Sequence, residues 1–303
     1  MKVLVCDSIS PRAVERMQKA GLDVDVDDKI TPEALLEKIE PYDAMVVRSR
    51  TKVRKQLIDC ATNLKVVVRG GVGVDNIDVD YAESKGIRIM NTPAASTHAV
   101  AELALTYIFA LARPIVQATE SMRSGLWEKS KFEGVEVAGK VLGIIGMGRI
   151  GQALAQRAAA IGMLVLGYDS RTVGAAPYMQ MVELDELLEK ADFISLHIPL
   201  TESSKHMLDA VMIGKMKAGV RIVDCARGGV LDEEALYDAI VGGKVAGAAL
   251  DVFENEPLAD RKLFELPQVI GSPHVGAGTK EATGRIGDEV ADILITVSQE
   301  PCN

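Results

Sequence analysis

The feature of this sequence that most restricts its fold is a repeated alternation of short, β-branched apolar runs with helical segments. Near the N-terminus, Ser10, Pro11 and Gly21 frame one helical segment as an N-cap, a first-turn proline and a stop. Strands that alternate with helices need crossover connections, which cover both faces of a parallel sheet. We predict strands at 2–7, 22–26, 44–49, 64–69 and 87–91, with helices at 10–21 and 31–40.

A second series of the same kind follows a change of pattern. Residues 96–113 form one long apolar helical segment that ends before Pro114, and helical sequence continues to Gly125. The second series opens at 140–151 and closes with a predicted helix at 279–299. Its predicted strands or strand ends lie at 163–169, 192–200, 220–229, 245–253 and 268–276. The fold class is therefore α/β, with two doubly wound parallel-sheet domains.

Composition limits the possible partners. The chain has 303 residues, 48% of them hydrophobic, which is enough for two domains of ordinary size. A formal net charge of −9 argues against a nucleic-acid or membrane surface, so any cations that bind an anionic ligand must be local. Four cysteines without a C-x-x-C pair argue against a disulfide framework and a zinc site. With no apolar run of membrane-spanning length, we expect a cytoplasmic protein without a bound metal.

Gly146, Gly148 and Gly151 form a G-x-G-x-x-G motif between a predicted strand and an Ala-rich helix. Glycines in this position allow a tight turn and a close approach of the backbone to a pyrophosphate at the helix N-terminus. Asp169 ends the next predicted strand, where a carboxylate binds ribose hydroxyls and favours NAD over NADP. Arg171 slightly weakens that preference. The alternative interpretation is a glycine-rich structural turn.

Arg227 ends a predicted buried strand and is followed at once by Gly228 and Gly229. Because ligands of parallel α/β sheets bind beyond the carboxyl ends of the strands, this position suits a guanidinium that binds a small anion. The alternative is a surface cation that forms a salt bridge with Asp232 or Glu233. The two glycines favour the binding role.

Glu256 and His274 follow two further predicted strands. Hydride transfer to a keto acid needs a cation for the carboxylate and an acid–base group of near-neutral pKa for the oxygen, and a carboxylate beside a histidine orients the ring. Alone, the acidic residues around Asp251 and Glu256 are more typical of a solvated loop. Spacing does not establish that Arg227, Glu256 and His274 converge. We interpret His98 and His206 as polar residues without a special role, and expect His197 on the adenine side of a cofactor cleft.

The ordered motifs GMGRIG, DCARGGVLDEEAL, ALDVFENEP and SPHVGAGT resemble those of the D-isomer-specific 2-hydroxyacid dehydrogenases. In the N-terminal half, VVRSRTKV and VVVRGGVGVDNIDVDYAESKGIRIMNTP resemble the members that act on 3-phosphoglycerate. The resemblance implies a Rossmann-type NAD domain at 96–281, which includes a dimerisation helix. It also implies that this domain is inserted into a flavodoxin-like catalytic domain made of 1–95 and 282–303, in a homodimer or homotetramer.

The resemblance further implies roles for individual residues. Arg227 would bind the substrate and polarise its carbonyl, and His274 would be the acid–base group with Glu256 as its partner. The implied NAD site consists of Val72, Gly146, Gly148, Arg149, Ile150, Gly151, Asp169, Ile198, Cys225, Asp251, His274 and Gly276. The implied substrate site consists of Arg48, Arg69, Gly71, Val72, Gly73 and Lys129, the last with Lys131 in a basic patch that reaches the phosphate across a dimer.

These expectations make the chain an oxidoreductase that converts D-3-phosphoglycerate reversibly to 3-phosphohydroxypyruvate, a step of serine biosynthesis, with NAD as cofactor. The cations Arg48, Lys52, Arg69 and Lys129–Lys131 exceed what one carboxylate needs. The alternative among enzymes is a glyoxylate or hydroxypyruvate reductase, or a D-lactate-type dehydrogenase. The alternative of another class is an NAD-sensing, corepressor-like binding protein. Glu256 argues against formate dehydrogenase, whose resemblance would put Gln at this position.

Overall fold

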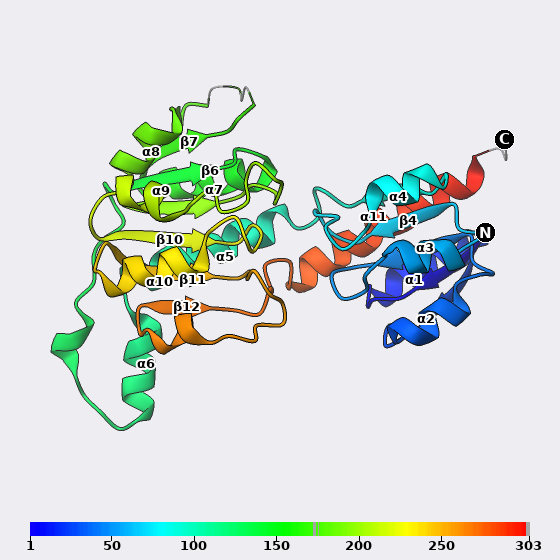
Figure 1. Cartoon of the computed structure of the whole chain (residues 1–303), viewed down its shortest axis with the longest axis horizontal. Helices are drawn as coiled ribbons and strands as arrows, with labels where there is room; N and C mark the ends of the chain where they lie inside the picture. Colours follow the sequence, from blue (N-terminus) through cyan, green and yellow to red (C-terminus); the bar gives the residue numbers. More distant parts are fainter. Residues whose placement is uncertain (172–173, 175, 301–303) are drawn as a thin grey trace. The chain divides into compact units, whose positions relative to one another are not determined.

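The computed structural model of the chain describes residues 1–171, 174 and 176–300 (Figure 1). These residues form two compact units, one of Met1–Ser96 with the chain from Ala277 onward, the other of Thr97–Gly276. The second boundary lies before Ala277 and not between 281 and 282 as expected. The reason is that Ala277, which precedes α11 (Lys280–Gln299), already packs against the core cluster of the first unit, and α11 continues in that core as far as Val297.

The first unit has a five-stranded parallel sheet with the order β2-β1-β3-β4-β5. Ser10 caps its first helix as predicted, because its side chain accepts the N–H of Ala13. Its strands are β1 (Lys2–Val5), β2 (Asp23–Val26), β3 (Ala44–Val47), β4 (Val66–Arg69) and β5 (Arg88–Asn91). Its helices before α11 are α1 (Pro11–Lys19), α2 (Pro32–Lys38), α3 (Lys55–Cys60) and α4 (Val79–Ser84).

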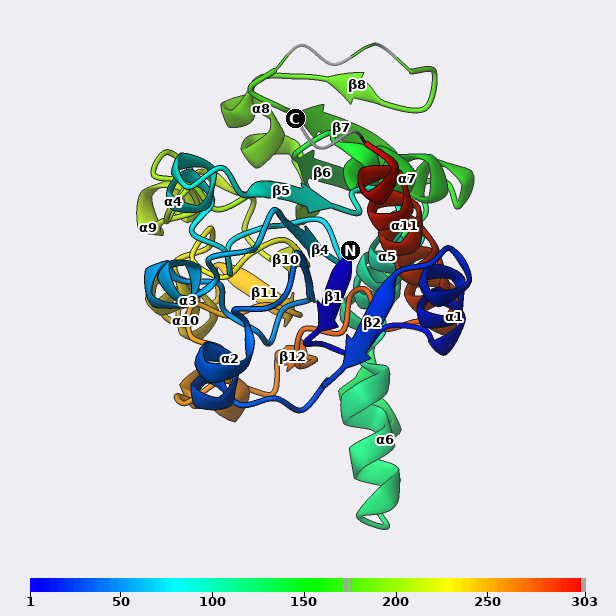
Figure 2. The ribbon, with the colours of Figure 1, turned by 90° about the vertical axis from the view of Figure 1, so that its right-hand side faces the viewer.

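Helices cover both faces of this sheet (Figure 2). One core cluster joins the sheet to α1 and α11, and another joins it to α2, α3 and α4. The close packing of α1 on α11 depends on Gly287, because a Cβ there would lie 2.6 Å from the Ser10 hydroxyl oxygen. The doubly wound arrangement predicted from the strand–helix alternation is therefore present.

The second unit has a seven-stranded parallel sheet with the order β12-β11-β10-β9-β6-β7-β8. The short strand β8 has no counterpart in the sequence prediction. The strands are β6 (Val141–Ile145), β7 (Leu164–Tyr168), β8 (Gln180–Met181), β9 (Phe193–Leu196), β10 (Val220–Asp224), β11 (Val245–Leu250) and β12 (Val269–Gly271). The helices are α5 (Thr97–Ala112), α6 (Ile115–Arg123), α7 (Arg149–Ala160), α8 (Leu184–Lys190), α9 (Ala210–Lys215) and α10 (Glu233–Val241), with 3-10 turns η1 (Lys129–Phe132) and η2 (Lys262–Glu265).

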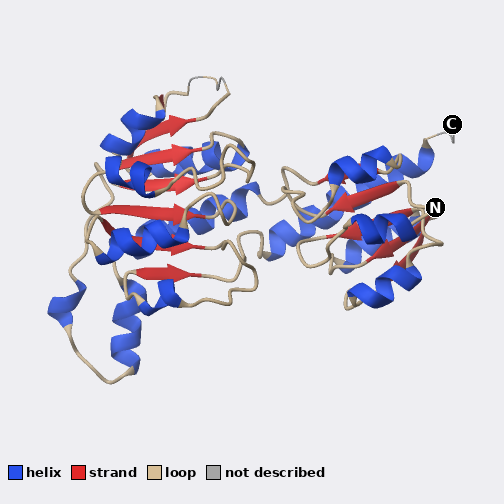
Figure 3. Cartoon of the chain, in the orientation of Figure 1, coloured by secondary structure: helices blue, strands red, loops and turns tan. Residues whose placement is uncertain are grey.

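The carboxyl ends of these strands form one edge of the sheet, as the parallel arrowheads show (Figure 3). One core cluster packs α5 and α7 on the sheet, and another packs α8, α9 and α10 on it. Several predicted strands extend too far, because the strand segments 192–200 and 220–229 end at Leu196 and Asp224. The residues beyond those points form the loops in which the motif residues lie.

No single helix among the described residues is long and apolar enough to cross a bilayer. Only α5 and α6 taken together reach that length and composition, and they are bent by 66° where they meet.

Candidate active site

The glycine-rich loop between β6 and α7 is a tight turn of the phosphate-binding kind. Gly146 has a φ of 100°, and a Cβ there would lie 2.6 Å from the carbonyl of His197. A Cβ at Gly151 would lie 2.1 Å from the Gly146 carbonyl oxygen, so glycine is required for this close start of the helix. At Gly148, in contrast, a Cβ would contact nothing within 4 Å, so the turn is open on this side.

Helix α7 begins at Arg149 without a side-chain cap. The N–H groups of the first turn, which includes Arg149, Ile150 and Gly151, have no partner within a helix. Together with the positive end of the helix dipole they suit a phosphate group. The predicted phosphate-binding residues therefore lie in one turn whose geometry fits a dinucleotide pyrophosphate.

Asp169 directly follows β7, next to this turn. Its carboxylate accepts the N–H of Met147 at 2.9 Å and the N–H of Arg171 at 2.9 Å. Burial raises the pKa of Asp169, but the hydrogen bonds from Arg171 and Met147 outweigh this effect and lower the pKa below its ordinary value. The carboxylate is therefore charged at neutral pH and is suited to accept from ribose hydroxyls.

Three more side chains lie near the turn or at the adjacent strand ends. Ile198 packs on the glycine turn, since a Cβ at Gly146 would lie 2.7 Å from its Cγ2. Cys225 follows β10, and burial raises the pKa of its thiol well above the ordinary value. Its side chain is therefore neutral and behaves as a small apolar group. Burial lowers the pKa of His197 to about 4, and its Nε2 lies 2.9 Å from the Ser195 hydroxyl. A neutral imidazole of this kind is compatible with an adenine-binding cleft.

Arg227 lies in the loop after β10, and its Nη1 donates to the Ala226 carbonyl at 2.6 Å. The two glycines that follow have separate physical reasons. A Cβ at Gly228 would lie only 1.8 Å from the Phe253 carbonyl oxygen, so this loop touches the backbone of the loop after β11. Gly229 has a φ of 84°, a left-handed conformation that glycine adopts without strain.

Glu256 and His274 come together as the sequence chemistry requires. Nδ1 of His274 lies 2.7 Å from Oε2 of Glu256, and the other carboxylate oxygen accepts the N–H of Phe253 at 3.2 Å. The two side chains are 34% and 36% exposed, so the pair is accessible to a ligand. Because β10, β11 and β12 are neighbours in the sheet, the loops of Arg227, Glu256 and His274 follow adjacent strands.

The loop that carries His274 is held by Asp251. This side chain is buried, and it accepts the N–H groups of Val275 and Gly276 at 2.8 and 2.7 Å and the hydroxyl of Ser272. The interpretation of Asp251 as a solvated loop acid is therefore wrong. His274 itself has a φ of 53°, an uncommon conformation for a residue with a Cβ. Asp251 contributes the hydrogen bonds that stabilise this turn.

In the first unit the predicted substrate residues follow the neighbouring strands β3 and β4. The N–H of Arg48 donates to the buried carboxylate of Asp7. A Cβ at Gly70 would lie 3.3 Å from Cγ of Arg48, so its side chain starts beside the end of β4. Gly71 has a φ of 148°, which residues with a Cβ rarely adopt, and a Cβ there would displace the Arg69 guanidinium. The loop then continues through Val72, whose carbonyl accepts the amide of Asn91, to Gly73.

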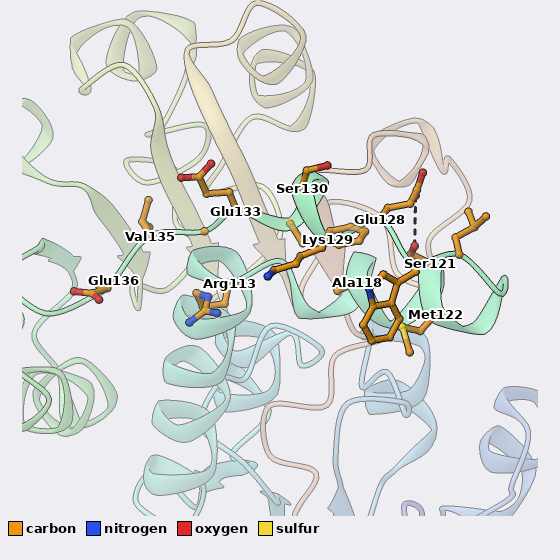
Figure 4. A pocket seen from close by; sticks show the side chains of 14 residues that line it. Arg113, Ala118, Ser121, Met122, Glu128, Lys129, Ser130, Glu133, Val135 and Glu136 are labelled. Atoms are coloured by element: carbon orange, nitrogen blue, oxygen red, sulfur yellow. Dashed lines mark hydrogen bonds between the residues drawn. The ribbon is translucent and has the colours of Figure 1, made fainter.

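Lys129 is not brought to the Arg227–Glu256–His274 group within the second unit. It lies in η1, on an extended segment with α6 that leaves the unit away from the carboxyl ends of its strands (Figure 1). This segment lines an open groove of about 1090 Å³ (Figure 4). Ser121 of α6 donates to Glu128 just before η1, and Lys131 forms an ion pair with the same carboxylate.

No group of three or more His, Cys, Asp or Glu side chains in the described part of the chain is arranged to hold a metal ion.

Residues 105–276 match the family model of the D-isomer-specific 2-hydroxyacid dehydrogenases, NAD-binding domain. The chain belongs to this family. The two-domain α/β fold and the NAD-binding domain expected from the sequence are thereby confirmed.

The chain is equally similar to relatives that carry two different enzyme names. The chain is 47% identical over 296 residues to the D-3-phosphoglycerate dehydrogenase of Methanocaldococcus jannaschii, covering 96% of this chain and 56% of that protein. It is 46% identical over 295 residues to the hydroxypyruvate reductase of Thermotoga maritima, covering 96% of each. A solved structure, the TT0316 protein of Thermus thermophilus, has a TM-score of 0.91 and 34% identity and covers 100% of this chain and 99% of that one. The chain thus spans about half the length of the phosphoglycerate dehydrogenases that it matches.

Sequence reasoning missed Asp224, which ends β10 below the Arg227 loop. The only signal for it was the polar residue at the end of an apolar run. The side chain is 2% exposed, and its carboxylate accepts the N–H of Ala226 at 2.8 Å. Burial raises the pKa of Asp224 to about 7, although the nearby Arg227 and the Ala226 hydrogen bond act in the opposite direction.

We therefore expect Asp224→Asn to remove a pH dependence of stability. A pKa raised from 3.8 in the folded protein stabilises it fully below about pH 4, and this contribution is lost as the pH rises through about 7. The amide keeps the acceptor for Ala226 but does not ionise, so the variant should be more stable than the wild type at pH 8, by about 1–4 kcal/mol. Thermal unfolding from pH 4 to 8 measures this, with the exposed Asp185→Asn as control. Parallel curves for the Asp224 variant and the wild type would contradict the expectation.

Proposed function

We propose that this chain catalyses NAD-dependent oxidation of D-3-phosphoglycerate to 3-phosphohydroxypyruvate, a reversible hydride transfer in serine biosynthesis. The observation that supports the chemistry is the contact of 2.7 Å between His274, after β12, and Glu256, after β11, the strand next to the one that precedes Arg227. Phosphoglycerate dehydrogenases among the relatives, at 43–47% identity, support the choice of acid.

The carboxylate of Glu256 defines what His274 can do. Because a carboxylate only accepts, the neutral imidazole carries its hydrogen on Nδ1 and leaves the lone pair on Nε2. Nε2 would then remove the hydroxyl proton during oxidation and return it during reduction, and Glu256 would stabilise the imidazolium between these events. Bound NAD accepts or supplies the hydride. Arg227 would bind the carboxylate of the acid with its planar guanidinium and polarise the reacting oxygen.

The other proposed ligand contacts follow the geometry of each loop. Gly146–Gly151 would bind the pyrophosphate and Asp169 the ribose, with Val72, Ile198, Cys225, Asp251 and Gly276 around the adenine or nicotinamide. Arg48, Arg69 and the backbone of 71–73 would bind the anionic acid. Arg48 and Arg69 are the basic side chains that favour a substrate with a second anionic group, because one carboxylate is already matched by Arg227.

Hydroxypyruvate or glyoxylate reduction is the second candidate. It is favoured by the hydroxypyruvate reductase of Thermotoga maritima, which the chain matches over 96% of its length. A D-lactate-type activity would use the same three residues. The candidate outside enzymes is an NAD sensor, which would bind NAD without turning over any of these acids.

The substrate is tested by the rate of NADH oxidation with four keto acids. We expect 3-phosphohydroxypyruvate to give a kcat/KM at least about tenfold above hydroxypyruvate, glyoxylate and pyruvate, because an added phosphate–Arg contact is charge-assisted. Equal values across the four acids would exclude the phosphate site but leave the family chemistry. No turnover with any of them would favour the sensor.

The acid–base group and the substrate cation are tested by His274→Ala and Arg227→Lys, respectively. We expect His274→Ala to lower kcat by roughly 10²–10⁴-fold, as for loss of a general acid–base group. Arg227→Lys should raise KM for the acid and lower kcat, because an ammonium cannot replace a bidentate guanidinium. Binding of NADH, measured by fluorescence, serves as the control and should stay close to wild type. Turnover that survives His274→Ala nearly intact would refute the assignment.

We further propose that the segment of α6 and η1 packs on a second copy of the chain. It exposes an unusual density of large apolar side chains, among them Ile115 at 61%, Met122 at 56% and Trp127 at 81%. Patches of this kind are rarely left in water. A second copy would cover them and give Lys129 a route to the phosphate of its partner's substrate.

The oligomer is tested by sedimentation at micromolar concentration. We expect the wild type to be a homodimer or a tetramer built from such dimers, and Trp127→Ser with Met122→Ser to shift it toward monomer, since the interface loses its largest apolar anchors. Val211→Ser, which removes a side chain of α9 that is 67% exposed, between Met122 and Trp127, is the matched control. A wild type that sediments as a monomer would rule the interface out.

A further inference from the structure

The loops that follow β10 and β11 touch at more than the Gly228–Phe253 contact. Glu233, the first residue of α10, and Glu254, in the loop after β11, exchange hydrogen bonds. The N–H of Glu254 donates to Oε1 of Glu233 at 2.7 Å, and the N–H of Glu233 donates to Oε1 of Glu254 at 3.3 Å. Each carboxylate therefore binds the backbone of the opposite loop, like a capping box formed between two segments.

His206 binds the same two loops. Its N–H donates to the Gly229 carbonyl at 2.7 Å, which ties it to the loop of Arg227. Its ring contacts both loops, with Nε2 at 3.1 Å from Oε1 of Glu254 and Nδ1 at 3.8 Å from Asp232. With a φ of 48° it is one of two described non-glycine residues with a positive φ, the other being His274. Such a conformation costs free energy and persists where the surroundings fix it.

These contacts lie close to the candidate active site, because Glu254 is two residues from Glu256 in the chain. Glu254 lies between Phe253, whose N–H binds Oε1 of Glu256, and Glu256 itself. Oε2 of Glu256 contacts His274. A displacement of Glu254 would therefore shift Glu256 and its contact with the imidazole. On the other side, Glu233 and His206 restrain the segment that begins at Arg227.

Several acidic side chains lie close together at this place, and their mutual repulsion destabilises the fold. One cavity of about 370 Å³ is lined by five acidic residues, with His206 and Lys262 among them: Asp232, Glu233, Glu234, Glu254 and Asp260. Burial raises the pKa of Glu233, and the charges of Glu254, Asp260 and Asp232 raise it further. The folded chain keeps like charges close together, and the hydrogen bonds to backbone N–H groups and to His206 compensate for this repulsion.

We propose that Glu233, Glu254 and His206 are positioning residues, which we term the brace, that hold the Arg227 loop and the Glu256 loop in the relative position needed for hydride transfer. The proposal rests on the proposed function, because it gives the brace a role in that reaction. None of the three side chains is assigned a contact with substrate or cofactor. They act through the backbone of the residues that have such contacts.

The test compares alanine with glutamine at the two acidic positions. Glu233→Ala and Glu254→Ala each remove an acceptor of a backbone N–H, and we expect kcat to fall about tenfold while KM for NADH changes less than about twofold, since small misplacements of reacting groups are costly. Glu233→Gln and Glu254→Gln keep a carbonyl oxygen as acceptor, so their kcat should be close to that of the wild type. Glu234→Ala removes a charge from the same cavity without removing any of these bonds and serves as the matched control.

A second measurement does not depend on turnover. The chain has four histidines, so the ring nitrogens of His274 are readily resolved in ¹⁵N spectra once His274→Ala identifies them. We expect Glu254→Ala, but not Glu254→Gln or Glu234→Ala, to shift the Nδ1 resonance of His274, because that nitrogen reports its bond to Glu256. If the alanine variants lower only the thermal midpoint, with kcat and the His274 resonance unchanged, the brace is merely structural and the proposal is overturned. If no keto acid is turned over, the proposed function fails. The shift of the His274 Nδ1 resonance then tests by itself whether the brace positions Glu256 and His274.

Discussion

Both sheets depend on one recurring interaction, in which an Asp at the carboxyl end of one strand accepts backbone N–H groups of the loop after a neighbouring strand. Asp7 after β1 binds the N–H groups of Arg48 and Thr51, beyond β3. Asp169 after β7 binds the N–H of Met147, beyond β6. Asp251 after β11 binds those of Val275 and Gly276, beyond β12. Adjacent strands lie about 4.8 Å apart, a distance that the short Asp side chain spans while it accepts a hydrogen bond.

This interaction determines which cations remain suited to a ligand. In the segment RSRT, Arg50 donates to Asp7 and to the carbonyls of Ile30, Cys6 and Asp28, so its guanidinium is used in structural hydrogen bonds. Arg48 differs because Asp7 is bound to its backbone N–H, while the one hydrogen bond of its guanidinium to the described residues is a long contact of 3.4 Å to the Ser8 carbonyl. The carboxylate orders the loop without neutralising the Arg48 side chain. A loop built in this way can present a guanidinium to an anion.

The sequence was sufficient for the architecture and for the residues at strand ends. Strand–helix alternation predicted two parallel sheets, and the glycine motif and the polar residues after predicted strands indicated Gly146–Gly151, Asp169, Arg227, Glu256 and His274, because parallel strands bring their carboxyl ends to one edge. The other members of the candidate site were implied by the family resemblance alone. The sequence was not sufficient for strand order, which decides that the loops of Arg227, Glu256 and His274 follow neighbouring strands. His206 was interpreted as a residue without a special role, and the role now proposed for it depends on contacts with Gly229 and Glu254 and on a backbone conformation that no local pattern indicates.

Asp224 shows why the number of backbone partners matters more than the position at a strand end. Like Asp169 and Asp251 it lies at the end of a β-strand segment of the second sheet, but the N–H of Ala226, in its own loop, is the one hydrogen bond that its carboxylate is seen to accept among the described residues. Burial then dominates and raises its pKa to about 7. At Asp169, three hydrogen bonds from Arg171 and Met147 exceed the effect of burial and lower the pKa. The same residue type at the same kind of position thus has a lowered pKa in one loop and a raised pKa in another, because Asp224 is more deeply buried and accepts fewer hydrogen bonds than Asp169.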